Sequence, residues 1–308
     1  MNSHKEGLEI LYLTLLLFGA LGNMFLLYLH SQKLIIGHRK RLISLIIINL
    51  ALAHTLMIFF RGIPIIIPWG WRSFLDDMMG KILNYIITVT RGVSLTTTCL
   101  LSVFQAITIS PNHPLRIEIK TWIHKHIISC SLLCWIFNIL VDVIMAANIS
   151  DATNSSNERW RIGHSSFNLH TGNTIKILIW KSVIDALFVG LMICSSGYMV
   201  SVLYRHRRQV QHIHTSLLLR ASHETRATKA ILMLVVNFVC FNSASSPFII
   251  YIASAKATKH WGLRFTVALS LFYPIVSPFM LISFDTQMPR SLNILLGLKR
   301  LGQEELSS

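Results

Sequence analysis

The chain has 308 residues, of which 53% are hydrophobic and only 13% are charged, and its formal net charge is +15. The charged fraction is about half of the roughly 25% that is usual in soluble domains, which argues against a soluble protein. The positive charge would by itself suggest a nucleic-acid partner, but most of it lies between long apolar runs. We therefore expect a membrane protein that binds no nucleic acid.

Seven stretches are long and apolar enough to cross a membrane, because a transmembrane helix needs about 20 mostly apolar residues. They predict an all-α integral membrane fold with a seven-helix domain over residues 1–284 and a short tail over residues 285–308. Residues Pro289–Gly302 of that tail have an apolar face and basic residues, which suits a helix lying on the membrane surface. In chain order, the predicted spans are Leu8–Leu29, Leu42–Phe60, Ile82–Ile109, Ile127–Ala147, Ile175–Leu203, Ala230–Ala255 and Phe265–Phe284.

Lysine and arginine in the connecting segments set the orientation, since cytoplasmic loops carry an excess of both. With the amino terminus outside, the inner segments hold 16 of these residues, against 7 in the three outer loops. We therefore place the amino terminus outside and the carboxyl terminus inside. The third inner loop then begins with the basic run RHRRQVQHIH (Arg205–His214), which we expect to contact anionic lipid and to bind a partner protein. His212 and His214 would lie on opposite faces of a helix, so no metal site is expected there.

An ionisable residue inside a span is costly and is by default a functional candidate. At 1.5 Å per helical residue, Arg91 of the third span and Asp185 of the fifth lie roughly 14–15 Å in from the outer side, so we expect them to pair. Lys181, one turn nearer the outside, competes for the same carboxylate. Asp142 of the fourth span is expected at a shallower level. The alternative role of an Arg91–Asp185 pair is a salt bridge between helices that contacts no ligand.

Prolines interrupt the last two predicted spans. Pro247 in the sixth span, and Pro274 and Pro278 in the seventh, each remove a backbone N–H donor, so we expect these helices to be kinked or loosened. Broken helices that line a polar cavity suit either a receptor or a transporter. The chain shows no internal repeat of the kind that many transporters have.

Several long segments carry a resemblance to a known family. The third span ends SLTTTCLLSVFQAITISP (Ser94–Pro111), the basic run is followed by HETRATKAILMLV (His223–Val235), and the seventh span contains FYPIVSPFMLIS (Phe272–Ser283). With GALGN (Gly19–Asn23) in the first span, they closely resemble the type-1 vomeronasal receptors, seven-helix G-protein-coupled receptors of chemosensory neurons. The similarity covers essentially the whole chain.

The resemblance implies a plasma-membrane receptor that detects pheromone-like small molecules among the outer halves of its helices and activates inhibitory-class (Gi/Go) heterotrimers inside. The candidate ligand contacts suggest an amphipathic molecule and are Tyr85, Arg91, Lys181, Asp185, Tyr251 and Phe272. The expected G-protein contacts are the basic residues Arg116, Lys120, Lys125, Arg205, Arg207 and Arg208. No enzymatic activity, cofactor or metal is expected, and His54 stands where many rhodopsin-like receptors hold a sodium-binding aspartate. A bitter-taste-like receptor, or a membrane transporter or channel, is the alternative.

Two features concern the second outer loop. It holds two N-x-S/T sequons, at Asn148 and Asn154, and we favour Asn154 for glycosylation because Asn148 abuts the membrane. The family usually pairs a cysteine in this loop with one at the top of the third span, and this chain has neither. A disulfide typically stabilises by about 2–4 kcal/mol, so its absence should loosen the roof of the pocket.

Overall fold

The computed structural model describes residues 2–35, 41–66, 77–110, 114–151, 160–162, 165–167, 172–210, 228–241 and 260–284. The predicted tail, Pro247, Tyr251 and Asn154 therefore lie outside the described residues. The long helices are α1 (Asn2–Ile35), α2 (Arg41–Ile66), α3 (Asp77–Ile109), α4 (Pro114–Asp151), α5 (Gly172–Val210) and α7 (His260–Phe284). A further helical segment, Thr228–Phe241, lies between α5 and α7 in the sequence.

Five of these helices contain a stretch long and apolar enough to cross a membrane, and the stretches overlap the first five predicted spans. They are Ile10–Ile35, Leu42–Arg61, Ile82–Ile109, Lys125–Val143 and Ile179–Arg205. The shorter apolar segments Thr228–Phe241 and Leu269–Ser283 overlap the sixth and seventh predicted spans. The architecture is thus that of a helical protein that crosses the membrane several times.

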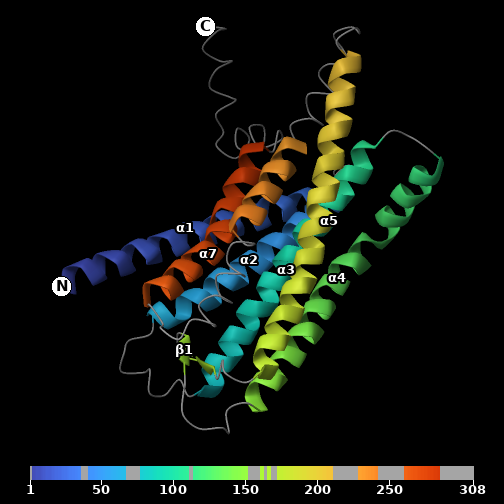
Figure 1. Ribbon diagram of the computed structural model, residues 1–308. Helices are drawn as coiled ribbons and strands as arrows, with labels where there is room; N and C mark the ends of the chain where they lie inside the picture. Colours follow the sequence, from blue (N-terminus) through green and yellow to red (C-terminus); the bar gives the residue numbers. More distant parts are fainter. Residues whose placement is uncertain are drawn as a thin grey trace, which may run out of the picture.

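A short hairpin departs from the predicted all-α fold. Strands β1 (Trp160–Ile162) and β2 (Ser165–Phe167) pair antiparallel, with Trp160 opposite Phe167. Strands of three residues are too short to show the alternation of apolar and polar residues by which a strand is recognised in a sequence. β2 contacts α3, and the hairpin lies at the end of the bundle opposite the last turns of α5 (Figure 1).

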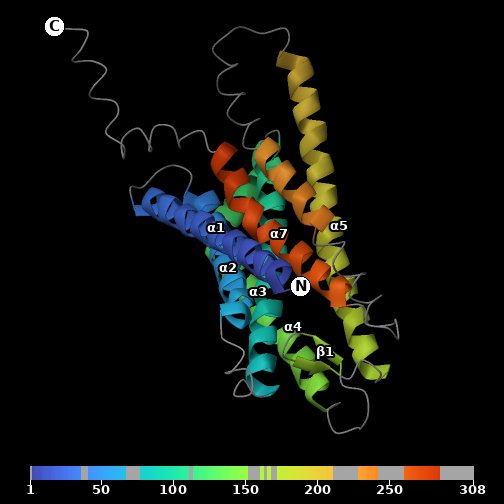
Figure 2. The same cartoon turned by 90° about the vertical axis from the view of Figure 1, so that its left-hand side faces the viewer.

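α3 is the central helix of the bundle. In the most apolar part of α3, 72% of the residues are buried, against 22% in the corresponding parts of α1, α4 and α5. α3 contacts α2, α4 and α5, and both views show it inside the bundle (Figures 1 and 2). The many large apolar side chains exposed on α1, α4 and α5 therefore face the hydrocarbon of the membrane, where their exposure carries no hydrophobic cost.

Two glycines of the GALGN segment let α1 approach α7 closely. A Cβ atom added at Gly19 would lie 2.8 Å from Cγ1 of Ile275, and one added at Gly22 would lie 3.0 Å from Cγ of Pro278. Small residues at helix interfaces allow such close approach in membranes, where tight packing and hydrogen bonds drive association. The spacing of these glycines thus positions α1 against the proline-containing part of α7.

Asn23 bonds a carbonyl that a proline leaves without its helical donor. Pro278 has no N–H, so the carbonyl of Pro274, four residues earlier, lacks the usual partner within the helix. Nδ2 of the buried Asn23 donates to that oxygen at 2.9 Å and to the carbonyl of Gly19 at 2.8 Å. α7 continues through both of its prolines, and the expected kink stays a prediction.

We expect Asn23→Ala to lower the free energy of unfolding by about 1–2 kcal/mol, because it leaves the buried Pro274 carbonyl with only the long contact from Oγ of Ser277, at 3.5 Å. Pro278→Ala restores a backbone N–H, so the Asn23 substitution should cost clearly less in a Pro278→Ala background. Thermal unfolding of the wild type, both single variants and the double variant in detergent measures this coupling. Equal costs of Asn23→Ala in the two backgrounds would contradict the role given to Asn23.

Candidate functional site

Four ionisable side chains from three helices gather in the half of the bundle nearer to the hairpin. They are Arg91 of α3, Asp142 of α4, and Lys181 and Asp185 of α5, and we name them the charge cluster. Nζ of Lys181 lies 3.1 Å from Oδ1 of Asp142, and the two side chains are 12% and 1% exposed. Asp185 is attracted by Arg91 and, less strongly, by Lys181. Two positive and two negative groups thus balance within the membrane.

The Lys181–Asp142 ion pair differs from what the sequence predicts. Asp142 lies nine residues before the end of α4 at Asp151, and Lys181 lies nine residues after the start of α5 at Gly172. The two residues therefore stand at the same level. α4 continues four residues beyond Ala147, where the predicted fourth span ends. The Arg91–Asp185 pairing stays a prediction, and Asp142 is a site residue that sequence reasoning did not include.

Two buried polar atoms near this cluster have no hydrogen-bond partner among the described residues. One is Oδ2 of Asp142, and the other is Nε of Arg61 on α2. The Arg61 side chain also hydrogen-bonds Tyr12 of α1 and interacts electrostatically with Arg91. Buried polar atoms without a partner are rare. Here the carboxylate oxygen of Asp142 can accept a hydrogen bond from a bound molecule, and the N–H of Arg61 can donate one to it.

Gly92 and Asn138 bring α3 and α4 together beside Lys181. A Cβ atom added at Gly92 would overlap Oδ1 of Asn138 and would lie 3.4 Å from Nζ of Lys181. Nδ2 of Asn138 donates to Oγ1 of Thr96 at 3.1 Å and to the carbonyl of Cys134 at 2.7 Å, which fixes its orientation. The close approach of the two helices therefore sets the position of the lysine.

The remaining predicted ligand contacts lie in different surroundings. Tyr85 of α3 donates to the carbonyl of Ile139 at 3.2 Å, next to Asp142. Phe272 lies on the exposed side of α7, where it is 44% exposed and its ring stacks on Phe241 with centroids 4.2 Å apart. The structure thus brings Tyr85 to the charge cluster, and it gives Phe272 a position on the outside of α7.

His54 forms a second polar centre, between α2, α3 and α7. Its Nε2 lies 2.7 Å from Oγ of Ser94 and its Nδ1 lies 2.9 Å from Oγ of Ser277. A neutral imidazole has one donor and one acceptor nitrogen, so these two hydroxyls occupy both. The ring of Tyr273 meets it edge-on at 5.1 Å. In the part of the chain that the structure describes, no three His, Cys, Asp or Glu side chains are grouped to hold a metal.

Hydroxyl side chains of α3 connect this central helix to each neighbour. Thr96 accepts from Asn138 of α4, and Thr97 accepts from Asn49 of α2 at 3.1 Å. The other two pairs, Thr98 with Tyr273 of α7 at 2.8 Å and Ser102 with Ser195 of α5, complete the set. These residues are buried, and the SLTTTCLLS segment has hydrogen-bond partners on several helices at once.

A sequence profile of the Vomeronasal organ pheromone receptor family matches residues 8–294. The chain belongs to this family. Vomeronasal type-1 receptor 3 of Homo sapiens is 36% identical to it over 306 residues, which cover 94% of each chain. Vomeronasal type-1 receptor 1 of Gorilla gorilla gorilla is 35% identical over 92% of this chain and 81% of the relative. Vomeronasal type-1 receptor 100 of Rattus norvegicus is 35% identical over 87% of this chain and 83% of the relative.

Membership in the vomeronasal receptor family confirms the resemblance carried by the first, third and seventh spans and by the third inner loop. It identifies the chain as a multi-pass membrane protein of a chemosensory receptor family, located as receptors are in the plasma membrane, and not as an enzyme. The charge cluster and the polar contacts of α3 are therefore features of a receptor.

The basic residues predicted to contact a G protein lie at the opposite end of this vomeronasal receptor from the hairpin. The first turns of α4 and the last turns of α5 lie at that end of the bundle (Figure 1). Arg205 and Lys125 are exposed there, while Asn148 belongs to the last turn of α4 at the hairpin end. The remaining four, Arg116 and Lys120 near the start of α4 and Arg207 and Arg208 near the end of α5, lie on the same two helix ends.

Proposed function

We propose that this receptor binds an amphipathic, pheromone-like small molecule at the charge cluster and passes the signal to Gi/Go heterotrimers at the opposite end of the bundle. The observation that carries the proposal is the charge cluster with its buried, unpartnered carboxylate oxygen on Asp142. A balanced set of charges inside a membrane protein is costly, and binding a polar ligand is a reason to keep it.

The proposal takes the chain to cross the membrane seven times with its amino terminus outside. The excess of lysine and arginine in the predicted inner segments supports this orientation. It puts the hairpin, the charge cluster and the sequons Asn148 and Asn154 on the outer side. The exposed Arg205 and Lys125 then lie at the cytoplasmic surface, where a G protein docks.

The ligand would place a polar group between Asp142, Arg61 and Arg91 and an apolar body against the neighbouring aromatic side chains. A donor group of the ligand would meet Oδ2 of Asp142, and an acceptor would meet the guanidinium of Arg61, so that both buried atoms gain a partner. Tyr85 is within this region, and the roles of Tyr251 and Phe272 as ligand contacts are part of the proposal.

Ligand binding would shift a pre-existing equilibrium between inactive and active arrangements of the helices. In the active arrangement the inner ends of α4 and α5 would present their basic residues to the G protein. Charge complementarity of this kind raises the rate of encounter and the selectivity more than the affinity. Removing the basic residues should therefore slow coupling without abolishing folding.

Nucleotide exchange on purified G proteins, measured with membranes that carry the receptor without ligand, tests the coupling. We expect faster exchange on Gi and Go than with receptor-free membranes, and a loss on the order of tenfold when Arg205, Arg207 and Arg208 are all changed to Gln. Lys176→Gln, at the other end of α5, is the matched control and should change nothing. Acceleration of Gs or Gq alone, or equal rates for the triple variant and the wild type, would contradict the proposal.

A further inference from the structure

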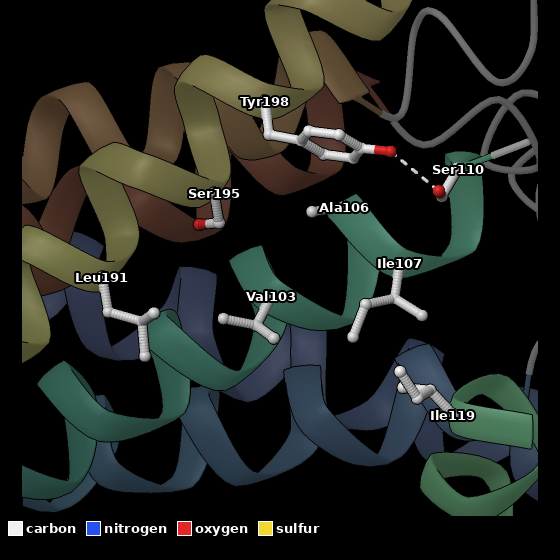
Figure 3. Close-up of a pocket in the computed structure, with 8 residues that line it drawn as sticks. All are labelled: Val103, Ala106, Ile107, Ser110, Ile119, Leu191, Ser195 and Tyr198. Atoms are coloured by element: carbon white, nitrogen blue, oxygen red, sulfur yellow. Dashed lines mark hydrogen bonds between the residues drawn. The ribbon is translucent and has the colours of Figure 1, made fainter. Parts of the chain in front are cut away.

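A cavity with a volume of about 300 Å³ lies between α3, α4 and α5 at the end of the bundle away from the charge cluster. Figure 3 shows that the last turns of α3 form one wall and α5 the other, with Ile119 of α4 at the edge. The lining residues are Val103, Ala106, Ile107, Ser110, Ile119, Leu191, Ser195 and Tyr198. Neither the ligand site nor the G-protein contacts described above use any of them.

The walls of this cavity offer hydrocarbon to an occupant. Its three hydroxyl-bearing residues already have partners, since Ser110 and Tyr198 are hydrogen-bonded at 2.7 Å across the cavity (Figure 3) and Ser195 is bonded to Ser102. The volume is at the lower limit of about 300–1,000 Å³ that is typical of sites for small molecules. The cavity therefore suits one apolar chain better than a compact polar ligand.

The cavity opens toward the membrane. Ile119, Leu191 and Tyr198 are 46%, 51% and 37% exposed, and exposed apolar side chains at this depth face lipid. α4 packs extensively on α3 and only slightly on α5, and the first turns of α4 stand apart from α5 (Figure 1). The occupant would therefore enter sideways from the bilayer, where acyl chains are the surrounding solvent.

A positive charge marks one end of the same face of α5. Leu191, Tyr198 and Arg205 are spaced by seven residues, so they lie along one stripe of the helix. Arg205 is exposed, and it lies about 10 Å beyond Tyr198 at 1.5 Å per residue. In the proposed orientation this end of α5 meets the inner leaflet, whose anionic lipids are attracted by basic residues.

We propose that an anionic glycerophospholipid of the inner leaflet binds here, with an acyl chain in the cavity and its headgroup at Arg205. Bound in this way, the lipid contacts α3 and α5 on both sides of the Ser110–Tyr198 hydrogen bond and holds the two helices together at the inner end. The assignment of the leaflet rests on the proposed orientation. The binding itself rests only on the cavity and on the arginine beside it.

Native mass spectrometry of the full-length receptor in detergent, with phosphatidylserine or phosphatidylcholine added, tests the proposal. We expect a retained phosphatidylserine adduct and a weaker phosphatidylcholine adduct. Arg205→Gln should reduce phosphatidylserine retention about fivefold, which corresponds to the roughly 1 kcal/mol that one basic residue contributes at an anionic surface. Lys176→Gln, which removes a positive charge from the other end of α5, should leave retention unchanged.

Filling the cavity provides the second arm of the test. Ala106→Phe or Val103→Phe should remove the adduct of either lipid. Leu17→Phe, at an exposed position of α1, which packs on α2 and α7, should not. Variants that bind less lipid must keep the unfolding temperature of the wild type in lipid-free detergent, and using two filling variants guards against one that misfolds. Retention that is the same for both lipids and unaffected by Arg205→Gln would overturn the proposed headgroup, and retention that survives both filling variants would overturn the site.

This measurement uses neither a ligand nor a G protein. A receptor that fails to activate Gi and Go but retains phosphatidylserine in this pattern would contradict the proposed coupling and leave the lipid site standing. A receptor that couples but retains no lipid would do the reverse.

Discussion

Asp142→Asn should remove the carboxylate that lies 3.1 Å from the buried Lys181 ammonium and lower the free energy of unfolding by about 3–5 kcal/mol. A loss of this size is comparable to the whole stability of many proteins, so we expect most of the variant to be retained inside the cell. Lys181→Met should act in the same way by leaving Asp142 unpaired. Cell-surface staining of an amino-terminal epitope, together with the unfolding temperature in detergent, measures both effects.

The double variant Asp142→Asn/Lys181→Met distinguishes an ion pair from two independent residues. Replacing both members of a buried pair is often nearly neutral, whereas removing one is not, so the double variant should recover much of the surface signal lost by either single change. Glu118→Gln, at an exposed position of the same α4 helix, is the control and should have no effect. A double variant whose loss equals the sum of the single losses would show that Lys181 and Asp142 do not stabilise each other.

Gly92→Ala is expected to cost about 3 kcal/mol, at the upper end of typical overpacking. The added methyl group would overlap Oδ1 of Asn138. The amide of Asn138 cannot turn away without losing its hydrogen bonds to Thr96 and to the Cys134 carbonyl. α3 and α4 must then separate, and Lys181, which lies beside Gly92, moves with them. A fall of the unfolding temperature and a weaker response to any activating ligand are the expected results.

Two other glycines provide matched controls for this prediction. Nothing lies within 4 Å of a Cβ atom added at Gly190 or at Gly197 of α5. Because alanine is the better helix former by roughly 0.5–1 kcal/mol, Gly190→Ala and Gly197→Ala should leave stability unchanged or raise it slightly. If Gly92→Ala behaved like these two, the close approach of α3 and α4 at Gly92 would be wrong.

The helices were predictable because hydropathy depends on composition over some twenty residues and little on the neighbours in space. Five spans lie where the apolar runs indicate. Residues 148–151 continue α4 beyond the predicted fourth span, which hydropathy alone does not show because a helix can extend past the apolar stretch. The predicted spans already place Asp142 and Lys181 at nearly the same distance from the outer ends of their helices. The ion pair was not predicted because the choice of carboxylate that faces Lys181 depends on how α4 and α5 are rotated about their axes.

Contacts that join distant helices could not be predicted from the sequence. The bond from Asn23 to the Pro274 carbonyl requires that α1 and α7 pack at the level of two glycines and a proline. His54 between Ser94 and Ser277 likewise depends on how α2, α3 and α7 are rotated about their axes. Hydropathy does not specify these rotations. The abundance of hydroxyl residues in α3 was the available signal that this helix would be surrounded by others.

The members of the charge cluster could be predicted from the sequence in part, but their pairing could not. The cost of a charge in a membrane was enough to select Arg91, Lys181 and Asp185 from the sequence as functional candidates. Hydropathy does not tell which base pairs with which acid, because the pairing depends on which side chains of α3, α4 and α5 face one another. Arg61 was counted as a loop residue, although α2 extends past it to Ile66 and places its guanidinium next to Tyr12.

An outer ligand site and an inner G-protein surface require that the chain has an odd number of spans and that its amino terminus lies outside. Epitopes at the two ends, stained on intact and then on permeabilised cells, measure this directly, and removal of N-glycans from the wild type and from Asn154→Gln locates the second outer loop. We expect the amino-terminal epitope to be stained on intact cells, the carboxyl-terminal one only after permeabilisation, and a glycan mass shift that Asn154→Gln abolishes. Staining of both ends on the same side, or of the carboxyl terminus alone on intact cells, would contradict the seven-span receptor with an outer ligand site and an inner G-protein surface.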